Sequence, residues 1–105
     1  MTTYFRPADE DTTTPYRAGA MGILRDDAVL KAGFWIANPA DVPQAVEILL
    51  PIDRTVLMLK GVMTYEVMGG PTYVIRTGDS VSFPKGTTIR LTVQEPVRQF
   101  FVDYR

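Results

Sequence analysis

The chemistry open to this chain is limited by two residue types that it lacks. Among its 105 residues there is no histidine and no cysteine. This excludes a cysteine nucleophile, a Ser-His-Asp relay, a two-histidine iron site and the usual structural zinc sites. A general acid or base must therefore be Asp, Glu, Tyr or Lys. A metal held by the protein would have to be a hard cation on oxygen ligands.

Two tyrosines near the middle of the chain are candidates for contact with a ligand. Gly69-Gly70-Pro71 separates the apolar run 62–68 from the run 72–76, which predicts a β-hairpin. Tyr65 and Tyr73 then share one face, where one phenol could reach a ligand. Glu66 and Arg76 are expected on the other face as a surface ion pair across the hairpin.

The elements that must position such residues read as short strands. Residues 21–30 are expected to form strands joined by a turn at residues 25–27, with one short helix as the alternative. Strands follow at 31–38, 44–50, 55–59, 62–68, 72–76, 80–83, 88–93 and 97–104. Six prolines lie between or at the ends of these strands, where the missing N–H group costs no ladder bond. About eight short strands at regular spacing predict an all-β sandwich or barrel.

Composition limits the partners and the compartment. Because 46% of the residues are hydrophobic, we expect one globular domain. The net charge of −1 gives no positive electrostatic field that would attract nucleic acid or an anionic membrane. No apolar run reaches membrane-spanning length, and no signal peptide is visible, so we expect a cytoplasmic protein. Residues 1–20 lack periodicity and are expected to form an extended arm on the barrel of residues 21–105, or a segment that closes over a ligand.

Several stretches resemble the cupin superfamily. Residues 78–86 contain the spacing Gly-x5-Pro-x-Gly, which is similar to the second cupin motif. Residues 32–35, 56–61 and 95–104 resemble strands of the small cupins related to the ethanolamine-utilisation Q protein and to ureidoglycine aminohydrolase. The likeness covers residues 30–104. It implies a small cupin barrel, that is, a double-stranded β-helix or jelly roll, and a homodimer.

The metal-ligand positions of that family carry other residues here. The histidine that follows the second motif is replaced by Ile89, and the glutamate of the first motif by Arg54. The two histidines of the first motif would fall near residues 47–50, which are Glu, Ile, Leu and Leu. The resemblance and these departures together imply a metal-free cupin without a cofactor.

The same comparison supplies a candidate site. Arg54 would point into the barrel and bind a carboxylate or enolate, with Glu47 as its ion-pair partner or as the base, and Tyr65 as a further acid or base. The alternatives are that Arg54 lies on the surface near Asp53 and that Glu47 is a solvated side chain. Asp103 and Tyr104 would lie at the barrel mouth or on the surface. The expected substrate-binding residues are Ile48, Leu50, Met58, Ile89, Tyr73 and Trp35.

Three functions remain open. The first is a metal-independent enzyme that acts on a small organic acid or biosynthetic intermediate by positioning and acid/base chemistry, as an isomerase, dehydratase or cyclase. The second is a non-catalytic small-molecule-binding or scaffold cupin. The third is a relative of the ethanolamine-utilisation protein with acetate kinase activity, although no glycine-rich phosphate loop is present. A cavity of about 300 Å³ or more behind Arg54 would favour ligand binding.

Overall fold

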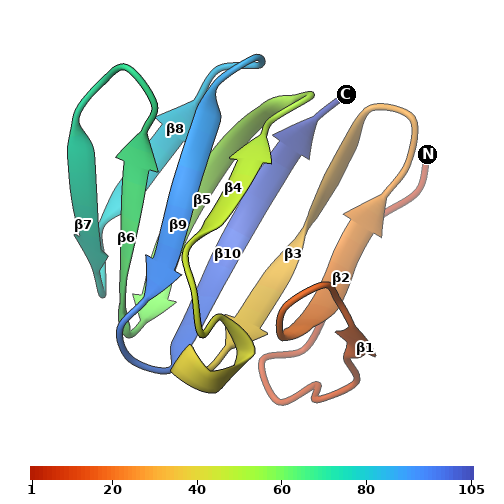
Figure 1. Ribbon diagram of the computed structural model, residues 1–105. Coiled ribbons are helices and arrows are strands. Elements are labelled where there is room, and N and C mark those ends of the chain that lie inside the picture. Colours follow the sequence, from red (N-terminus) through yellow and green to blue (C-terminus); the bar gives the residue numbers. More distant parts are fainter.

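Two antiparallel sheets face each other and enclose the core. The computed structural model describes residues 1–105. The larger sheet has the strand order β1-β2-β3-β10-β5-β8 and the smaller one the order β4-β9-β6-β7 (Figure 1). The predicted all-β barrel is therefore confirmed. No helix of this chain is long and apolar enough to cross a membrane.

The strands agree closely with the expected segments. Their bounds are β1 Thr14–Pro15, β2 Ala20–Asp26, β3 Leu30–Ala37, β4 Val46–Leu49, β5 Asp53–Lys60, β6 Val62–Val67, β7 Thr72–Arg76, β8 Ser80–Phe83, β9 Thr88–Val93 and β10 Val97–Tyr104. A 3₁₀ turn, η1 (Pro39–Asp41), lies in the connection that carries the chain from the larger sheet to the smaller one (Figure 1). The two-residue strand β1, which lies within the N-terminal arm, was not expected.

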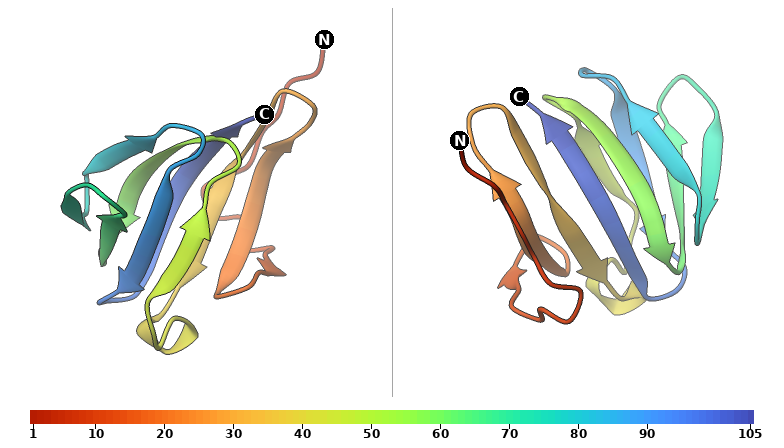
Figure 2. Two further views of the ribbon diagram at one scale, coloured as in Figure 1. Left: turned by 45° about the horizontal axis from the view of Figure 1, so that its top comes forward. Right: turned by 180° about the vertical axis from the view of Figure 1, so that it is seen from behind.

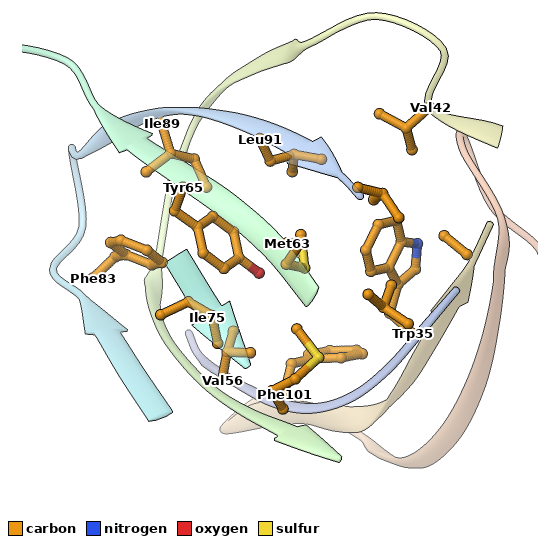
Figure 3. Packing of buried hydrophobic residues seen from close by; sticks show 14 of the residues in the cluster. Trp35, Val42, Val56, Met63, Tyr65, Ile75, Phe83, Ile89, Leu91 and Phe101 are labelled. Atoms are coloured by element: carbon orange, nitrogen blue, oxygen red, sulfur yellow. The ribbon is translucent and has the colours of Figure 1, made fainter. Parts of the chain in front are cut away.

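The core is built by the two-residue alternation of the strands. In β9, Ile89, Leu91 and Val93 are buried, because every second side chain of a strand points to the same face. Side chains from both sheets meet in the middle of the barrel, where Tyr65 and Phe83 pack edge to face with ring centroids 5.1 Å apart (Figure 3). The larger sheet contributes its central strand β10, which is paired with β3 on one side and β5 on the other.

The turn between β2 and β3 is held by one aspartate. Asp27 accepts hydrogen bonds from the backbone N–H groups of Val29 and Leu30 and from Arg25 Nε. The hydrogen bond from Arg25, followed by those from the backbone, lowers the pKa of the Asp27 carboxyl well below its ordinary value. The turn between strands that the sequence predicts near residues 25–27 is thus present, centred slightly later in the chain.

The N-terminal arm runs along the outer face of the larger sheet, over β2 (Figure 2, right). Arg6 holds this course: its Nη2 donates to the carbonyl of Thr12 at 2.8 Å, and its guanidinium lies 5.9 Å from the ring centre of Phe34. Gly22 provides the space for it, because a Cβ there would lie 2.6 Å from Arg6 Nη2.

Candidate functional site

A pocket opens between β4, the edge strand of the smaller sheet, and the strands β2, β3, β10 and β5 of the larger one. Its volume is about 390 Å³, and 12 of its 19 lining residues are hydrophobic. The charged or amide lining residues are Arg17, Lys31, Arg54, Gln99, Asp103 and Arg105, and the hydrophobic set includes two tyrosines that also carry hydroxyl groups, Tyr16 and Tyr65. The pocket therefore combines an apolar wall with a small set of polar groups, as ligand sites commonly do.

Arg54 and Asp103 form an ion pair that lines this pocket. The two residues lie directly opposite each other on β5 and β10. Arg54 Nε donates to Asp103 Oδ1 at 2.7 Å and Nη2 donates to Oδ2 at 2.9 Å, while the two side chains are 24% and 9% exposed. Burial acts to lower the pKa of Arg54, but the hydrogen bonds and charge of Asp103 more than offset it, so the pKa is raised. Arg54 thus faces the pocket and not the surface near Asp53.

Tyr65 and Gln99 form a second, deeper polar pair. The Tyr65 hydroxyl donates to Gln99 Oε1 at 2.9 Å, and the two residues are only 2% and 7% exposed. Figure 3 shows the Tyr65 hydroxyl pointing toward the middle of the barrel. Burial raises the pKa of Tyr65 strongly, and the charge of Arg54 and the hydrogen bond to Gln99 offset only part of that rise. The phenol is therefore protonated at neutral pH and is suited to hydrogen bonding, not to action as a base.

The pocket carries an excess of positive charge. Four basic side chains line it against one carboxylate, Asp103. Arg54 is paired with that carboxylate, and Arg105 is paired with Asp26 outside the lining. Arg17 and Lys31 form no ion pair with an acidic side chain. The pocket is thus electrostatically suited to an anion.

One wall of the pocket comes from the end of the N-terminal arm. Residues 16–18 line the pocket, and Trp35 Nε1 donates to the carbonyl of Ala18 at 2.8 Å. The turn closes through Gly19, whose carbonyl accepts a hydrogen bond from the N–H of Tyr16. Gly19 has a φ of 91°, and a Cβ there would lie 2.2 Å from the carbonyl oxygen of Ile36, so only glycine fits.

The residues that the sequence suggested for substrate binding divide into two groups. Trp35, Ile48 and Leu50 line the pocket. Met58 and Ile89 are fully buried in the core and do not line it. Tyr73 lies directly opposite Tyr65 in the hairpin of β6 and β7, but it is 43% exposed and does not line the pocket.

The expected pairing of Glu47 with Arg54 is wrong. Glu47 is exposed on the outer face of β4, opposite Arg90 of β9, because Val46 and Ile48 on either side of it point inward. The carboxylate that meets Arg54 is Asp103. Glu47 therefore has no access to the pocket from its place in the smaller sheet.

The expected surface pair of Glu66 with Arg76 is also wrong. In the hairpin, Glu66 lies opposite Thr72, and Arg76 lies opposite Val62. The carboxylate of Glu66 instead lies 3.9 Å from Arg90 Nη1, on the neighbouring strand β9. Both side chains are about half exposed, so this pair contributes little to stability.

Two pocket residues come from β10. Gln99 is not among the candidates that the sequence suggests. Of the two positions expected for Asp103 and Tyr104, Asp103 takes the one at the pocket, while Tyr104 is exposed. The signal was the alternation of Val97, Gln99, Phe101 and Asp103, which are all buried. Because Phe100 and Phe101 are adjacent and both apolar, the sequence did not show which of the two alternating sets faces inward.

A two-sheet antiparallel barrel with a ligand-sized pocket between its sheets is the architecture of a small cupin. The chain belongs to this superfamily: the family model of the EutQ-like cupin domain matches residues 24–101. The resemblance drawn from the cupin motifs is thereby confirmed. No curated protein matches the chain.

Solved structures agree with this fold. A Salmonella typhimurium LT2 protein that carries the name ethanolamine utilization protein Q is 22% identical, with a TM-score of 0.69 over 81% of this chain and 68% of that one. The Clostridium difficile EutQ protein is 18% identical, with a TM-score of 0.68 over 81% of this chain and 66% of that one. A Ralstonia eutropha JMP134 protein that carries the name mannose-6-phosphate isomerase is 23% identical, with a TM-score of 0.68 over 93% and 89%. At these identities the likeness shows the fold alone.

The residues of this pocket do not fit the metal ion that cupins commonly hold. No group of three or more Asp or Glu side chains gathers anywhere in the chain, which lacks His and Cys altogether. The single carboxylate of the pocket, Asp103, has both oxygens engaged by Arg54. A divalent cation would also meet the positive charges of Arg54 and Lys31, so the donor set is unsuitable.

Proposed function

We propose that this protein is a metal-independent cupin that binds a small organic acid in the pocket and acts on it by positioning and proton transfer. The observation that carries this proposal is the Arg54 guanidinium, held by Asp103 within a largely apolar pocket of about 390 Å³. A carboxylate with a short carbon skeleton matches both the charge and the lining.

Arg54 keeps hydrogen-bonding capacity for a ligand. A guanidinium carries five N–H donors, and Asp103 occupies one at Nε and one at Nη2. The remaining N–H groups can bind a ligand carboxylate. Because Asp103 already orients the guanidinium, little ordering remains to be done when the ligand arrives. The unpaired cations Arg17 and Lys31 add attraction for the anion.

The apolar part of the pocket suits the carbon skeleton of such an acid. Trp35, Ile48, Leu50 and Phe101 line it, and its volume lies within the range of about 300–1,000 Å³ common for small-molecule sites. Burial of the ligand's carbon atoms against these side chains would supply a favourable hydrophobic term.

The polar groups suggest how a bound acid could be activated. Asp103 is the only carboxylate that lines the pocket, so it is the candidate for a carboxylate base. Arg54 can stabilise negative charge that develops on an oxygen of the ligand, as in an enolisation, whereas the single proton of the Tyr65 hydroxyl is engaged by Gln99. This combination favours isomerisation, dehydration or cyclisation over phosphoryl transfer, for which no glycine-rich phosphate loop is present.

A non-catalytic binding or scaffold protein would use the same pocket without turnover. The difference is measurable by incubating the protein with each acid that binds and following the acid by proton NMR. If resonances of a product appear at a rate proportional to protein concentration, the protein is a catalyst. If the spectrum of every bound acid stays unchanged, the protein is a non-catalytic binding protein.

The binding step itself is tested by isothermal titration with a panel of short-chain carboxylic acids at pH 7 and low salt. We expect binding to the wild type and to Arg90→Met, a control arginine on the outer surface, and at least tenfold weaker binding to Arg54→Met. Arg54→Lys, which keeps the charge but loses the planar fork, should fall between them. If no acid binds, or if Arg54→Met binds as well as the wild type, the proposal is refuted.

We also propose the homodimer that the family resemblance suggests. Phe100 and Phe34 lie on the outer face of the larger sheet with ring centroids 5.4 Å apart, and Leu57 and Leu59 on the same face are 40% and 39% exposed. A mass of twice the 11.7 kDa of one chain in light scattering would support the dimer. A mass of one chain at every protein concentration would exclude it.

A further inference from the structure

Gln99 is a buried polar residue whose hydrogen bonding is only half used within the protein. It lies on β10 between Trp35 of β3 and Met58 of β5, with its side chain toward the pocket. Its Oε1 accepts the hydroxyl of Tyr65. Its Nε2 carries two N–H donors, and neither has a partner in the protein.

The free nitrogen faces the pocket. Gln99 Nε2 has no hydrogen-bond partner, yet it is not fully enclosed by protein atoms. The only side-chain nitrogen or oxygen that is both enclosed and without a partner is Arg6 Nε, on the far side of the larger sheet. Gln99 Nε2 therefore borders open space. Gln99 as a whole is 7% exposed, and the space that it lines is the pocket. Two N–H donors therefore project into a largely apolar cavity.

Tyr65 sets the direction of this amide. Its hydroxyl donates to Oε1 at 2.9 Å, and both residues are buried. An amide whose oxygen is engaged in this way presents its nitrogen on the other side. Tyr65 thus acts through Gln99 as a positioning residue.

We propose that Gln99, oriented by Tyr65, determines the specificity of the pocket by donating a hydrogen bond to a carbonyl or hydroxyl oxygen on the chain of the bound acid. The substrate class is then oxo or hydroxy acids and not simple alkyl acids. This inference rests on the proposed function, because it assumes that Arg54 binds the carboxylate of the same ligand.

Arg54 and Gln99 line the same pocket. Gln99 and Asp103, the partner of Arg54, share one face of β10 and are four residues apart, which is about 13 Å along an extended strand. A ligand that contacts both groups must therefore carry its carboxylate and its second oxygen at different positions along its carbon chain. An alkyl chain placed against Gln99 would leave its N–H donors without a partner, and that loss is the source of discrimination.

Matched acids test the inference by isothermal titration. Hexanoate and 5-oxohexanoate have the same chain length and differ in one carbonyl oxygen, and 5-hydroxyhexanoate tests the hydroxyl. We expect the wild type to bind 5-oxohexanoate about 3–10 times more tightly than hexanoate, the value of one hydrogen bond. Gln99→Leu should bind both acids equally, and Tyr65→Phe should lower the ratio because the amide is free to turn.

A measurement on the wild type avoids any dependence on how the variants fold. In proton–nitrogen NMR spectra, the side-chain amide signal of Gln99 should shift on addition of 5-oxohexanoate and much less on addition of hexanoate. If acids bind through Arg54 but the affinity ratio is near one and the Gln99 signal responds equally to both, this inference is overturned while the proposed function stands. If no acid binds, the proposed function itself has failed.

Discussion

Replacing Arg54 by Met should destabilise the protein through the partner that it leaves behind. Asp103 is 7% exposed, and without Arg54 its carboxylate would remain in the pocket wall with neither of its present donors. Breaking a fully buried pair costs about 3–5 kcal/mol, and an exposed pair contributes about 0.2–1 kcal/mol. With side chains 24% and 9% exposed, this pair lies between the two limits, and we expect a loss of about 2 kcal/mol.

A double-mutant cycle isolates the interaction. Arg54→Met, Asp103→Asn and the double variant are unfolded in urea at pH 7, with fluorescence of the single tryptophan, Trp35, as the probe. The double variant should be more stable than the sum of the two losses predicts, by about 1–2 kcal/mol. Arg90→Met is the matched control: its exposed partner Glu66 is 3.9 Å away, so its effect should stay within about 0.5 kcal/mol. Additive losses in the cycle would refute the view that Asp103 holds Arg54 in place.

Three further predictions concern other parts of the site. Burial raises the pKa of Tyr65, so above the ordinary pKa of 10.0 the unfolded chain loses the phenol proton while the folded state keeps it. The contribution of Tyr65 to the free energy of unfolding is therefore complete below pH 10 and is lost as the pH rises. Between pH 9 and 11 the wild type should lose about 1.4 kcal/mol more than Tyr65→Phe in urea unfolding, and equal losses would contradict the burial of the phenol. Glu47→Gln should leave acid binding unchanged and stability within about 0.5 kcal/mol, because Glu47 lies on the outer face of the barrel; weaker binding would place Glu47 in the site after all. Elemental analysis of the purified protein should find no stoichiometric iron, manganese, nickel or zinc, and dialysis against a chelator should leave acid binding intact; one bound ion per chain would refute the metal-independent proposal.

The strands could be predicted because their signals are local. Prolines and glycines mark the turns, and the period of two in segments such as Val46–Leu50 is visible without knowledge of any partner. The same alternation placed Glu47 on the outer face. The expected pairing of Glu47 with Arg54 came instead from the place of residues 47–50 in the family motif, and the local pattern was the better guide.

The site could be predicted only in part because it depends on choices between distant strands. Phe100 and Phe101 left the facing of β10 open, and the structure shows that Phe101 faces the core while Phe100 packs against Phe34 outside. That choice turns Gln99 and Asp103 into the pocket.

The sequence by itself determined an all-β fold, the approximate positions of most strands and the lack of residues for a transition-metal site, since these follow from residue types and from a side-chain period of two. Only the tertiary structure decided the partners. Arg54 and Asp103 are 49 residues apart in the chain, and Tyr65 and Gln99 are 34 apart. They meet because β10 pairs with β5 in one sheet and faces β6 across the barrel, and no local pattern specifies which distant strand a segment joins.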